Sequence, residues 1–372
     1  MTTITPPVSP LLAEHRSLGA HFIDFAGWQM PLKYSSELAE HHAVRSTAGL
    51  FDLSHMGEIL VAGRQADAML DYALAGMLSK VAVGRAKYSL LCNDDGGVID
   101  DLVAYRLAPD RYLVVANASN ANTVSRELAT RAADFDVVVQ DQSAETSLIA
   151  VQGPKAVQII SELVSPEQAA LVDACKYYGS LPAVVAGVHV LLARTGYTGE
   201  DGFELYVTAD HAVELWRALL EITTAHGGIA AGLACRDSLR LEAGMALYGN
   251  ELTLETSPYE AGLGRVVQLD KPFVGRDALA QFAEGSVCRK LVGLRGSGRR
   301  AARAGYGVFD AAGEREIGIV TSGALSPTLG YPVAMAYVEI PLSEPGTELN
   351  VDIRGTRQPF TVVSTPFYRR SN

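Results

Sequence analysis

The segment NDDGGVIDDLVAY, residues 93–105, contains the turn and the strand from which the fold class is read. Its first five residues, NDDGG, are a strong turn signal between two runs of apolar character. We expect strands at 87–92 and 98–107, paired as a hairpin around this turn. The second strand carries two adjacent aspartates, a residue type that is depleted in strands.

The flanking sequence alternates between helical and extended patterns. The helices we expect cover 10–20, 36–48 (capped by Ser35 or Ser36), 64–75, 120–133, 154–164, 210–226 and 234–243. Further strands are expected at 111–116, 136–140 and 146–151, with a strand pair within 186–208. Beyond Gly285, short strands alternate with glycine and proline, which is typical of a small β domain, for which a barrel is one arrangement. The pattern predicts an α+β fold with a β-rich C-terminal domain.

The composition of the 372 residues is that of a folded globular protein, with 48% hydrophobic and 20% charged residues. A formal net charge of −11 argues against general nucleic-acid binding. Two short basic runs, at 299–303 and 369–370, are interpreted as solvated surface, with contact to an anionic ligand as the alternative. The sequence has no apolar run long enough to span a membrane and no secretory pattern near its start, so we expect a cytoplasmic protein.

Sequence motifs for metal, nucleotide or covalent chemistry are lacking. The four cysteines, at 92, 175, 235 and 288, are far apart and form no metal-ligand spacing with histidine. His41, His42 and His55 are interpreted as structural. The sequence contains no phosphate-binding loop, dinucleotide fingerprint or nucleophile elbow. The remaining carboxylates, amides, arginine and aromatics suit a heterocycle held by hydrogen bonds, and we expect no metal.

Asp100 and Asp101 lie on opposite faces of the expected strand, because side chains alternate along a strand. Asp101 shares its face with Ile99, Val103 and Tyr105, so at least one carboxylate should lie among apolar neighbours. Such a group needs a partner or a raised pKa to be buried. A functional role and a role in capping the turn are equally supported by the pattern, which does not choose between the two aspartates.

Several other polar residues occur in comparable settings. Tyr88 lies in the paired strand, Asn117 follows an apolar strand, Glu204 lies between Phe203 and Leu205, and Arg236 opens a helix. Taken singly, each has a structural explanation: a turn for Asn117, a solvated strand face for Glu204, and a surface ion pair for Arg236.

Twelve segments, in order along nearly the whole chain, carry a resemblance to the aminomethyltransferase, or T-protein, of the glycine cleavage system. They are DFAGW (24–28), MPL (30–32), HAVR (42–45), FDLSHMGE (51–58), YS (88–89), GVIDDL (97–102), QGP (152–154), RTGYTGE (194–200), RD with RLEAG (236–244), LYG (247–249), TSG (321–323) and SPTLG (326–330).

The resemblance implies an α+β fold of three domains, arranged as a cloverleaf around a central folate channel. The implied domains are 1–56 with 142–275, then 57–141, and a C-terminal barrel-like domain at 276–372.

The resemblance also implies the reaction and its site. The enzyme would transfer a methylene carbon from the aminomethyl-lipoyl arm of H-protein, its partner, to tetrahydrofolate, its co-substrate, and release ammonia. The family's catalytic aspartate matches Asp101. Its folate-binding residues match Met56, Tyr88, Asn117, Tyr197, Glu204 and Arg236.

The chain departs from the family pattern at two positions: Arg265 stands where tryptophan is common, and Cys235 stands where alanine is usual. Two alternatives remain from the same resemblance. A folate module of a flavin dehydrogenase would need an additional dinucleotide domain. A non-catalytic folate-binding protein that assists iron–sulfur assembly would carry a cysteine motif, and residues 244–251, GMALYGNE, contain no cysteine.

Overall fold

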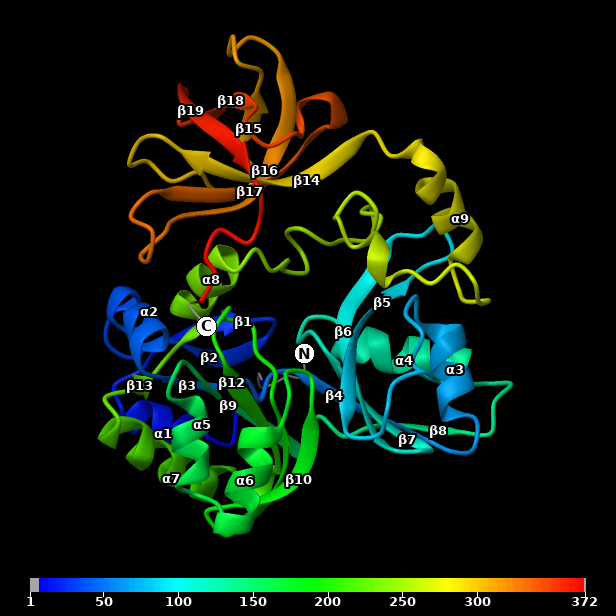
Figure 1. Cartoon of the computed structure of the whole chain (residues 1–372), viewed down its shortest axis with the longest axis vertical. Coiled ribbons are helices and arrows are strands. Elements are labelled where there is room, and N and C mark those ends of the chain that lie inside the picture. The colour runs from blue at the N-terminus through cyan, green and yellow to red at the C-terminus, as the bar shows by residue number, and fades with distance from the viewer. Residues whose placement is uncertain (1–6, 371–372) are drawn as a thin grey trace, which may run out of the picture. The chain divides into compact units, whose positions relative to one another are not determined.

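The computed structural model describes residues 7–370, which form two compact units. The first unit contains the residues up to Met69, Leu78–Lys87 and Val103–Asp237. The second unit contains Leu70–Met77, Tyr88–Leu102 and the residues from Ser238 onward. The chain passes between the units inside single elements, including the two strands of the predicted hairpin (Figure 1).

The first unit is built on a six-stranded sheet of order β10-β11-β12-β9-β3-β13. The strands are β3 (Gly49–Asp52), β9 (Thr146–Gln152), β10 (Ser180–Val185), β11 (Val188–Ala193), β12 (Gly202–Thr208) and β13 (Ile229–Ala230). All its pairs are antiparallel except β3 with β13. A separate hairpin joins β1 (His21–Phe25) to β2 (Trp28–Lys33).

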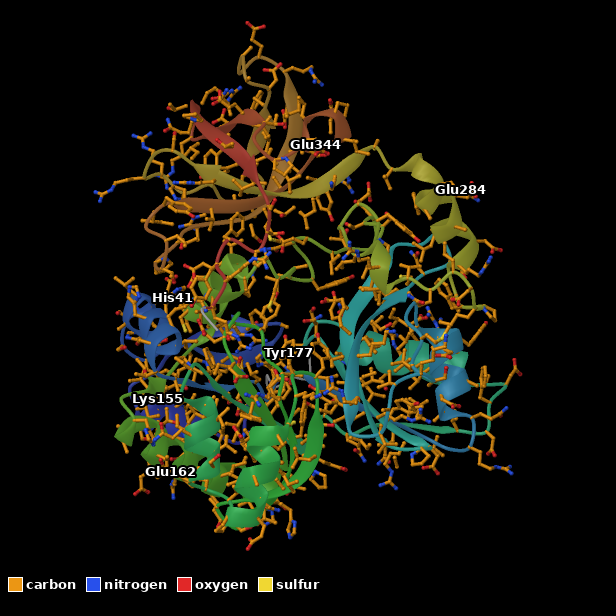
Figure 2. All side chains as sticks on the ribbon, in the orientation of Figure 1. His41, Lys155, Glu162, Tyr177, Glu284 and Glu344 are labelled. Atoms are coloured by element: carbon orange, nitrogen blue, oxygen red, sulfur yellow. The ribbon has the colours of Figure 1, made fainter. Side chains whose placement is uncertain are left out.

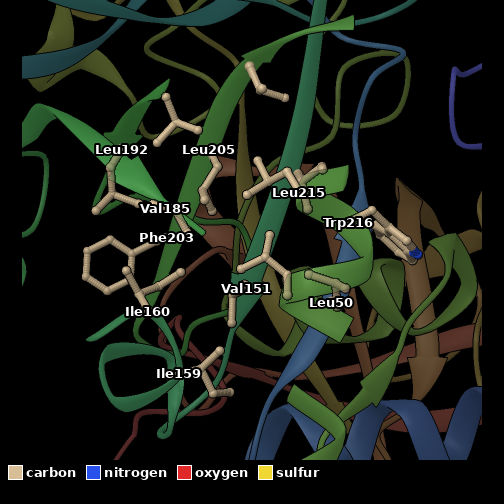
Figure 3. Close-up of a cluster of buried hydrophobic side chains, with 14 of the residues drawn as sticks. Leu50, Val151, Ile159, Ile160, Val185, Leu192, Phe203, Leu205, Leu215 and Trp216 are labelled. Carbon is tan, nitrogen blue, oxygen red and sulfur yellow. The ribbon is translucent and has the colours of Figure 1, made fainter. Parts of the chain in front are cut away.

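Helices cover one face of this sheet and form its core. The helices of this part are α1 (Leu12–Ser17), α2 (Glu37–Ser46), α5 (Ala156–Ser161), α6 (Pro166–Ala174) and α7 (Ala212–Ala225). Ile159 and Ile160 of α5 and Trp216 of α7 belong to the same buried apolar cluster as Phe203 and Leu205 of β12 (Figure 3). The apolar residues of β12 therefore point into this core, and the alternate residues of the strand face the other way.

A five-stranded sheet has the order β5-β6-β7-β4-β8. Its strands are β4 (Gly57–Ala62), β5 (Arg85–Cys92), β6 (Val98–Ala108), β7 (Arg111–Ala116) and β8 (Val138–Asp141), with α3 (Ala66–Ala73) and α4 (Ala121–Arg131) following in the chain after β4 and β7. β4 lies next to the edge strand β8 and pairs antiparallel with both β7 and β8.

The second unit contains a closed barrel of six strands in the order β14-β17-β16-β15-β18-β19. They are β14 (Arg289–Gly296), β15 (Gly307–Phe309), β16 (Glu316–Leu325), β17 (Pro332–Glu339), β18 (Glu348–Ile353) and β19 (Thr356–Val363). β14 pairs with both β17 and β19, which closes the barrel. The interior is filled by its own apolar side chains, including Leu294, Val351 and Phe360.

The second unit also includes α9 (Arg276–Gln281) and α8 (Leu233–Glu242), which begins in the first unit. A second core in this unit joins Leu90, Cys92 and Val98 to Leu252 and Phe273. Two of the four cysteines, Cys92 and Cys235, are buried, as expected for small apolar side chains.

The prediction of an α+β fold with a C-terminal β domain is confirmed. The predicted helices and strands all occur, with ends that differ by a few residues. Ser36 caps α2 by accepting a hydrogen bond from the Ala39 amide at 3.1 Å. The three-domain division remains a prediction.

Surface side chains are mostly polar around these cores. Lys155 and Glu162, labelled in Figure 2, flank α5 and contact the end of α7. The Glu162 carboxylate contacts His226 Nε2 at 2.8 Å while remaining partly exposed. Among residues 7–370, no helix combines the length and apolar character that a membrane crossing requires.

Candidate active site residues in the two units

Glu204 lies on β12, on the face opposite the hydrophobic core. Its neighbours Phe203 and Leu205 are fully buried in that core, so strand alternation turns Glu204 away from it. β12 is an inner strand, with Glu204 opposite Ala193 of β11 and Ala150 of β9. The side chain is half-buried, so it is only partly exposed to solvent.

A chain of hydroxyl groups ends at one oxygen of Glu204. Thr195 Oγ1 donates to Glu204 Oε2 at 2.5 Å, and the Tyr105 hydroxyl lies 3.3 Å from the same oxygen. Tyr105 also contacts Thr195 Oγ1 at 2.9 Å and accepts from the Tyr206 hydroxyl at 3.2 Å. Within residues 7–370, Glu204 Oε1 has no hydrogen-bond partner. One carboxylate oxygen is thus anchored, and the other is available to a ligand.

Burial raises the pKa of both tyrosines well above its ordinary value, and the Glu204 charge adds to the effect. Both phenols therefore remain protonated over the whole physiological range and can act only as neutral hydrogen-bonding groups.

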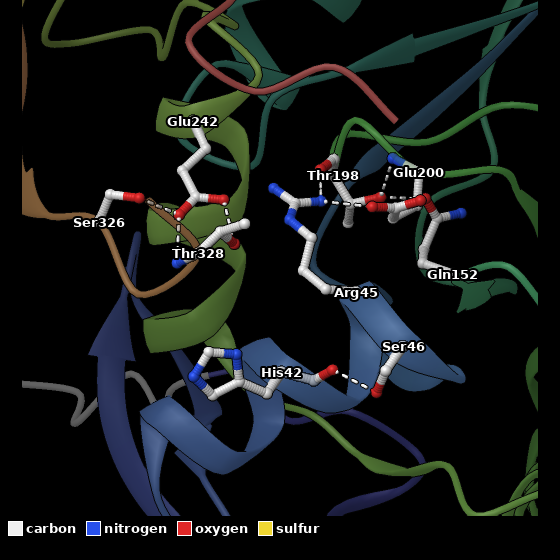
Figure 4. Close-up of polar contacts among 9 residues, drawn as sticks. All are labelled: His42, Arg45, Ser46, Gln152, Thr198, Glu200, Glu242, Ser326 and Thr328. Atoms are coloured by element: carbon white, nitrogen blue, oxygen red, sulfur yellow. Dashed lines mark hydrogen bonds and ion pairs between the residues drawn. The ribbon is translucent and has the colours of Figure 1, made fainter. Parts of the chain in front are cut away.

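The loop that carries Thr195 and Tyr197 is fixed by buried side chains. Gln152 donates to the Thr195 carbonyl at 3.0 Å and accepts from Thr198 Oγ1 at 3.0 Å. Arg45 of α2 donates to the Thr198 carbonyl at 2.7 Å and to Glu200 at 3.1 Å (Figure 4). Gln152 approaches so closely that a Cβ at Gly196 would lie 1.9 Å from its Oε1, so a larger residue there would displace the Gln152 side chain.

Arg236 lies in the first turns of α8, whose start is anchored by a buried carboxylate. Glu40 accepts from the Gly232 amide at 2.9 Å, immediately before α8, and from the Tyr34 amide at 2.8 Å. The Arg236 guanidinium lies over the Tyr197 ring, 4.8 Å from its centroid, in a cation–π contact.

The guanidinium of Arg236 is partly shielded from solvent. Burial lowers its pKa, and the nearby Tyr197 and Glu204 act in the opposite direction. A half-buried arginine stacked on an aromatic ring is unlike the surface ion pair that was one reading of the sequence.

His55, in the turn before β4, is buried and uncharged at neutral pH. Burial and the Arg236 charge lower its pKa to about 4. Its ring meets Phe25 edge to face, with the centroids 5.2 Å apart. The interpretation of His55 as a structural residue agrees with this setting.

Met56 and Asn117 occupy the same end of the β4–β7 strand pair. The antiparallel register matches Gly57 with Ala116, so Met56 and Asn117 lie just beyond the last pair. Both side chains are half-buried.

In the second unit, Asp101 accepts a hydrogen bond from Tyr88. The Tyr88 hydroxyl lies 3.0 Å from Asp101 Oδ2, and both side chains are half-buried. Asp100, on the other face of β6, is fully buried, so at least one of the two carboxylates is removed from solvent.

The turn before β6 fixes the start of this strand. Asn93 Oδ1 accepts from the Gly97 amide at 2.7 Å, and the Val98 amide donates to the Thr253 carbonyl at 3.1 Å. A Cβ at Gly97 would lie 1.8 Å from the Leu254 carbonyl oxygen, so only glycine fits there.

The predicted site residues thus form local groups: Tyr197, Glu204 and Arg236 together, Met56 beside Asn117, and Tyr88 with Asp101. The sequence analysis did not identify three residues of the hydrogen-bonded hydroxyl chain beside Glu204, namely Thr195, Tyr105 and Tyr206. A signal existed for Tyr206, which shares the Glu204 face two residues along the same strand.

Two other types of site are not supported by the described residues. Residues 7–370 contain no group of three or more histidine, cysteine, aspartate or glutamate residues suited to a metal. Ser9, His15 and Asp52 form a buried cluster, but Ser9 and His15 both contact Asp52 Oδ2, at 2.5 Å and 2.7 Å. Since His15 bonds to the aspartate and Tyr34 rather than to Ser9, the cluster is not arranged as a nucleophile with its base.

Comparison with known families defines the class of protein. Residues 11–271 match the GCVT N-terminal domain, and residues 289–369 match the glycine cleavage T-protein C-terminal barrel domain. The second match coincides with the closed barrel. A mixed α/β body followed by such a barrel is the domain pair of glycine cleavage T-proteins.

Individual relatives agree with this class over the full chain. The chain is 57% identical over 369 residues to the aminomethyltransferase of Saccharopolyspora erythraea, with 99% of both chains covered. It is 55% identical to that of Streptomyces avermitilis, with 100% of both covered. The crystal structure of glycine cleavage system aminomethyltransferase T from Bartonella henselae matches with a TM-score of 0.90 and 37% identity, covering 98% of each chain.

The chain belongs to the aminomethyltransferase family, the T-proteins of the glycine cleavage system. The predictions of this family and of an enzyme are confirmed. The alternative of a non-catalytic protein for iron–sulfur assembly is not favoured, because the relatives with full-length matches are aminomethyltransferases.

Proposed function

We propose that this chain transfers the methylene carbon of an aminomethyl-lipoyl group to tetrahydrofolate. Two bonds of the carbon break, to nitrogen and to sulfur, and two form, to folate N5 and N10. The two protons displaced from N5 and N10 leave with ammonia and with the lipoyl thiol. The products are 5,10-methylenetetrahydrofolate, ammonia and the reduced lipoyl arm.

Asp101 is the proposed catalytic residue of this transfer. Its carboxylate would orient the N5 and N10 edge of the folate and stabilise the positive charge that develops during transfer. It would also carry a proton from the attacking nitrogen. The Tyr88 hydroxyl, which donates to Asp101 Oδ2 at 3.0 Å, supports this role because it holds the carboxylate in a defined orientation.

Glu204 is the proposed acceptor for the amino and ring N–H groups of the pterin. The observation that carries this assignment is its asymmetric anchoring: Oε2 receives the Thr195 hydroxyl, while Oε1 has no partner among the described residues. Tyr197 and Arg236 supply an aromatic ring and a planar cation in the same group. Met56, Tyr88 and Asn117 are proposed to line the remainder of the folate site.

Holding the two reactants in the correct orientation is expected to account for much of the rate enhancement. Holding two reacting groups in the correct geometry can contribute roughly 7–11 kcal/mol. The partner that presents the aminomethyl group is proposed to be the lipoylated H-protein, and the reaction to occur in the cytoplasm.

The Asp101→Asn variant tests the proposal, because it keeps the shape of the side chain and removes its charge. We expect kcat for transfer from aminomethyl-loaded H-protein to fall at least about 100-fold, the usual contribution of a general acid or base. Tetrahydrofolate affinity, measured by calorimetry under anaerobic conditions, should change much less. Asp95→Asn, an exposed aspartate in the turn of the same hairpin, is the matched control.

Near-normal transfer by Asp101→Asn would contradict the catalytic assignment. Failure of the unaltered protein to bind tetrahydrofolate would contradict the proposed co-substrate itself.

A further inference from the structure

Glu58, the second residue of β4, is a fully buried carboxyl group without a partner. Its exposed fraction is 0%, and neither Oε1 nor Oε2 has a hydrogen-bond partner among the described residues. Buried polar groups are normally hydrogen-bonded, so an orphaned carboxyl in a well-packed sheet requires an explanation. A leucine would fill this position without the cost of burying polar atoms.

The backbone of Glu58 keeps the side chain in this interior position. The Glu58 amide donates to Ser143 Oγ at 2.9 Å, and its carbonyl accepts from the Gln142 amide at 2.8 Å. β4 also pairs with β7, where Glu58 lies opposite Val115. With its strand held on both sides, the carboxyl cannot reach solvent by a local backbone shift.

The titratable groups around Glu58 are acidic or phenolic and come from two other strands. Asp141 belongs to β8, and Glu204 and Tyr206 belong to β12. Burial raises the pKa of Glu58 well above its ordinary value, and the charges of Asp141 and Glu204 raise it further. Arg236 acts on Glu204 from the side of α8. Glu58 therefore holds a proton at neutral pH.

We propose that Glu58 is a positioning residue of the Glu204 site, a neutral carboxylic acid that keeps Glu204 as the only negative charge of the pair. This inference rests on the proposed role of Glu204 in binding the pterin. When two carboxyl groups share a buried region, their pKa values separate, so that one group stays protonated while the other is ionised.

The proposal has a direct physical consequence for ligand binding. Ionisation of Glu58 would place a second negative charge near Glu204 in a region with little water to screen it. Glu204 is held only through Oε2, by Thr195 and Tyr105, so repulsion would act on the oxygen intended for the ligand. Tetrahydrofolate affinity should therefore fall as the pH rises through the pKa of Glu58.

The Glu58→Gln variant separates this effect from a merely structural role, because an amide of the same shape stays neutral at every pH. For the unaltered enzyme we expect the tetrahydrofolate Kd to rise at least about tenfold from pH 7 to the most alkaline pH at which the protein stays folded, because burial raises the pKa of Glu58. For Glu58→Gln, the Kd should match that of the unaltered enzyme within about threefold at pH 7 and stay within that range at high pH.

Glu162→Gln, a carboxylate-to-amide change at a partly exposed position, should follow the unaltered enzyme. Groups elsewhere that titrate at high pH are shared by all three proteins and cancel in the comparison. The same alkaline loss in Glu58→Gln would overturn the proposal, and so would a Glu58→Gln protein that binds poorly already at pH 7.

Infrared spectroscopy of the ligand-free enzyme provides a second measurement that requires no variant. Labelling glutamate with carbon-13 should shift a protonated-carboxyl band observed at pH 7, and the absence of such a band would overturn the proposal. This result does not depend on folate. A protein that shows the band but binds no tetrahydrofolate would contradict the proposed function rather than the state of Glu58.

Discussion

Asp52, at the end of β3, is held by three donors inside the first unit. Ser9 and His15 contact Oδ2, and the Ser54 amide donates to Oδ1 at 2.9 Å. Burial alone would raise the pKa of Asp52, but the hydrogen bonds and charge of His15 and the bonds from Ser9 and Ser54 lower it. A buried carboxylate is tolerated here because every side of it is paired.

This pairing predicts a pH-dependent loss of stability in Asp52→Asn. A carboxyl with a lowered pKa stabilises the fold above its unfolded pKa, about 3.9, and loses this contribution as the pH falls through the folded value. At pH 7 we expect the variant to lose about 1.5–3 kcal/mol of unfolding free energy, the usual contribution of hydrogen bonds to a charged group.

Urea unfolding at pH 7 and at about pH 3 measures this difference. The difference in unfolding free energy between the unaltered protein and Asp52→Asn should be smaller at the lower pH. Asp95→Asn, at an exposed position, is the control. An equal difference in unfolding free energy at both pH values would contradict the lowered pKa of Asp52.

Some of the important residues could be identified from the sequence, and others could be recognised only in the folded structure. Asp101 and Glu204 were chosen from the family resemblance, while the strand pattern alone left both with structural explanations. The Ser9–His15–Asp52 cluster could not be anticipated, because its members are separated by up to 43 residues and meet only in the folded chain. Glu58 lay inside a quoted motif, but its isolation from any partner is a property of the packed sheet.

At the scale of elements, Arg240 near the end of α8 connects segments of the second unit. It donates to Glu251 at 2.8 Å and to Ser322 of β16 at 2.7 Å, and both charged side chains are almost completely buried. Glu242, two residues later, accepts from the Thr328 hydroxyl at 2.8 Å and from Ser326 (Figure 4). The last turn of α8 is therefore fastened to the barrel by charged and polar contacts.

Removing Arg240 alone should lower the unfolding free energy more than neutralising both members of the Arg240–Glu251 ion pair. Arg240→Met leaves the Glu251 charge buried, so we expect a loss of about 3–5 kcal/mol in unfolding free energy. The double variant Arg240→Met, Glu251→Gln should recover part of this loss, since no unpaired charge remains. A double-mutant cycle by urea unfolding measures the coupling, and strictly additive losses would contradict it.

The sequence analysis missed α6, although its start has a recognisable capping pattern. It also missed the β1–β2 hairpin, which has no such pattern. α6 has a clear start, with Ser165 accepting from the Gln168 amide and Pro166 in the first turn, a pattern present in the sequence. The β1–β2 hairpin turns through Ala26 with a φ of 53°, a conformation that alanine rarely adopts. Its turn could not be assigned from residue preferences.

At the scale of the whole molecule, the two units have separate hydrophobic cores. Leu349 is buried in the barrel core, a cluster that shares no residue with the core of the first unit. Leu349→Ala should cost about 2–5 kcal/mol through lost burial and the cavity that remains.

Hydrogen exchange monitored by mass spectrometry tests whether this cost stays local. Amides of β17 and β18 should exchange faster in Leu349→Ala, while those of β9 and β12 should be unchanged. Equal acceleration in both sets would show that the described residues unfold as one cooperative block.

The division of the chain into alternating segments has a consequence for biosynthesis. The strand residues that include Tyr88 and Asp101 belong to a unit whose largest part begins at Ser238. On the ribosome, the first unit can reach its native packing once residue 237 has left the exit tunnel, but the hairpin tip must wait for the last third of the polypeptide. A nascent chain in this interval would expose Leu90 and Val98, which makes it a natural client for chaperones.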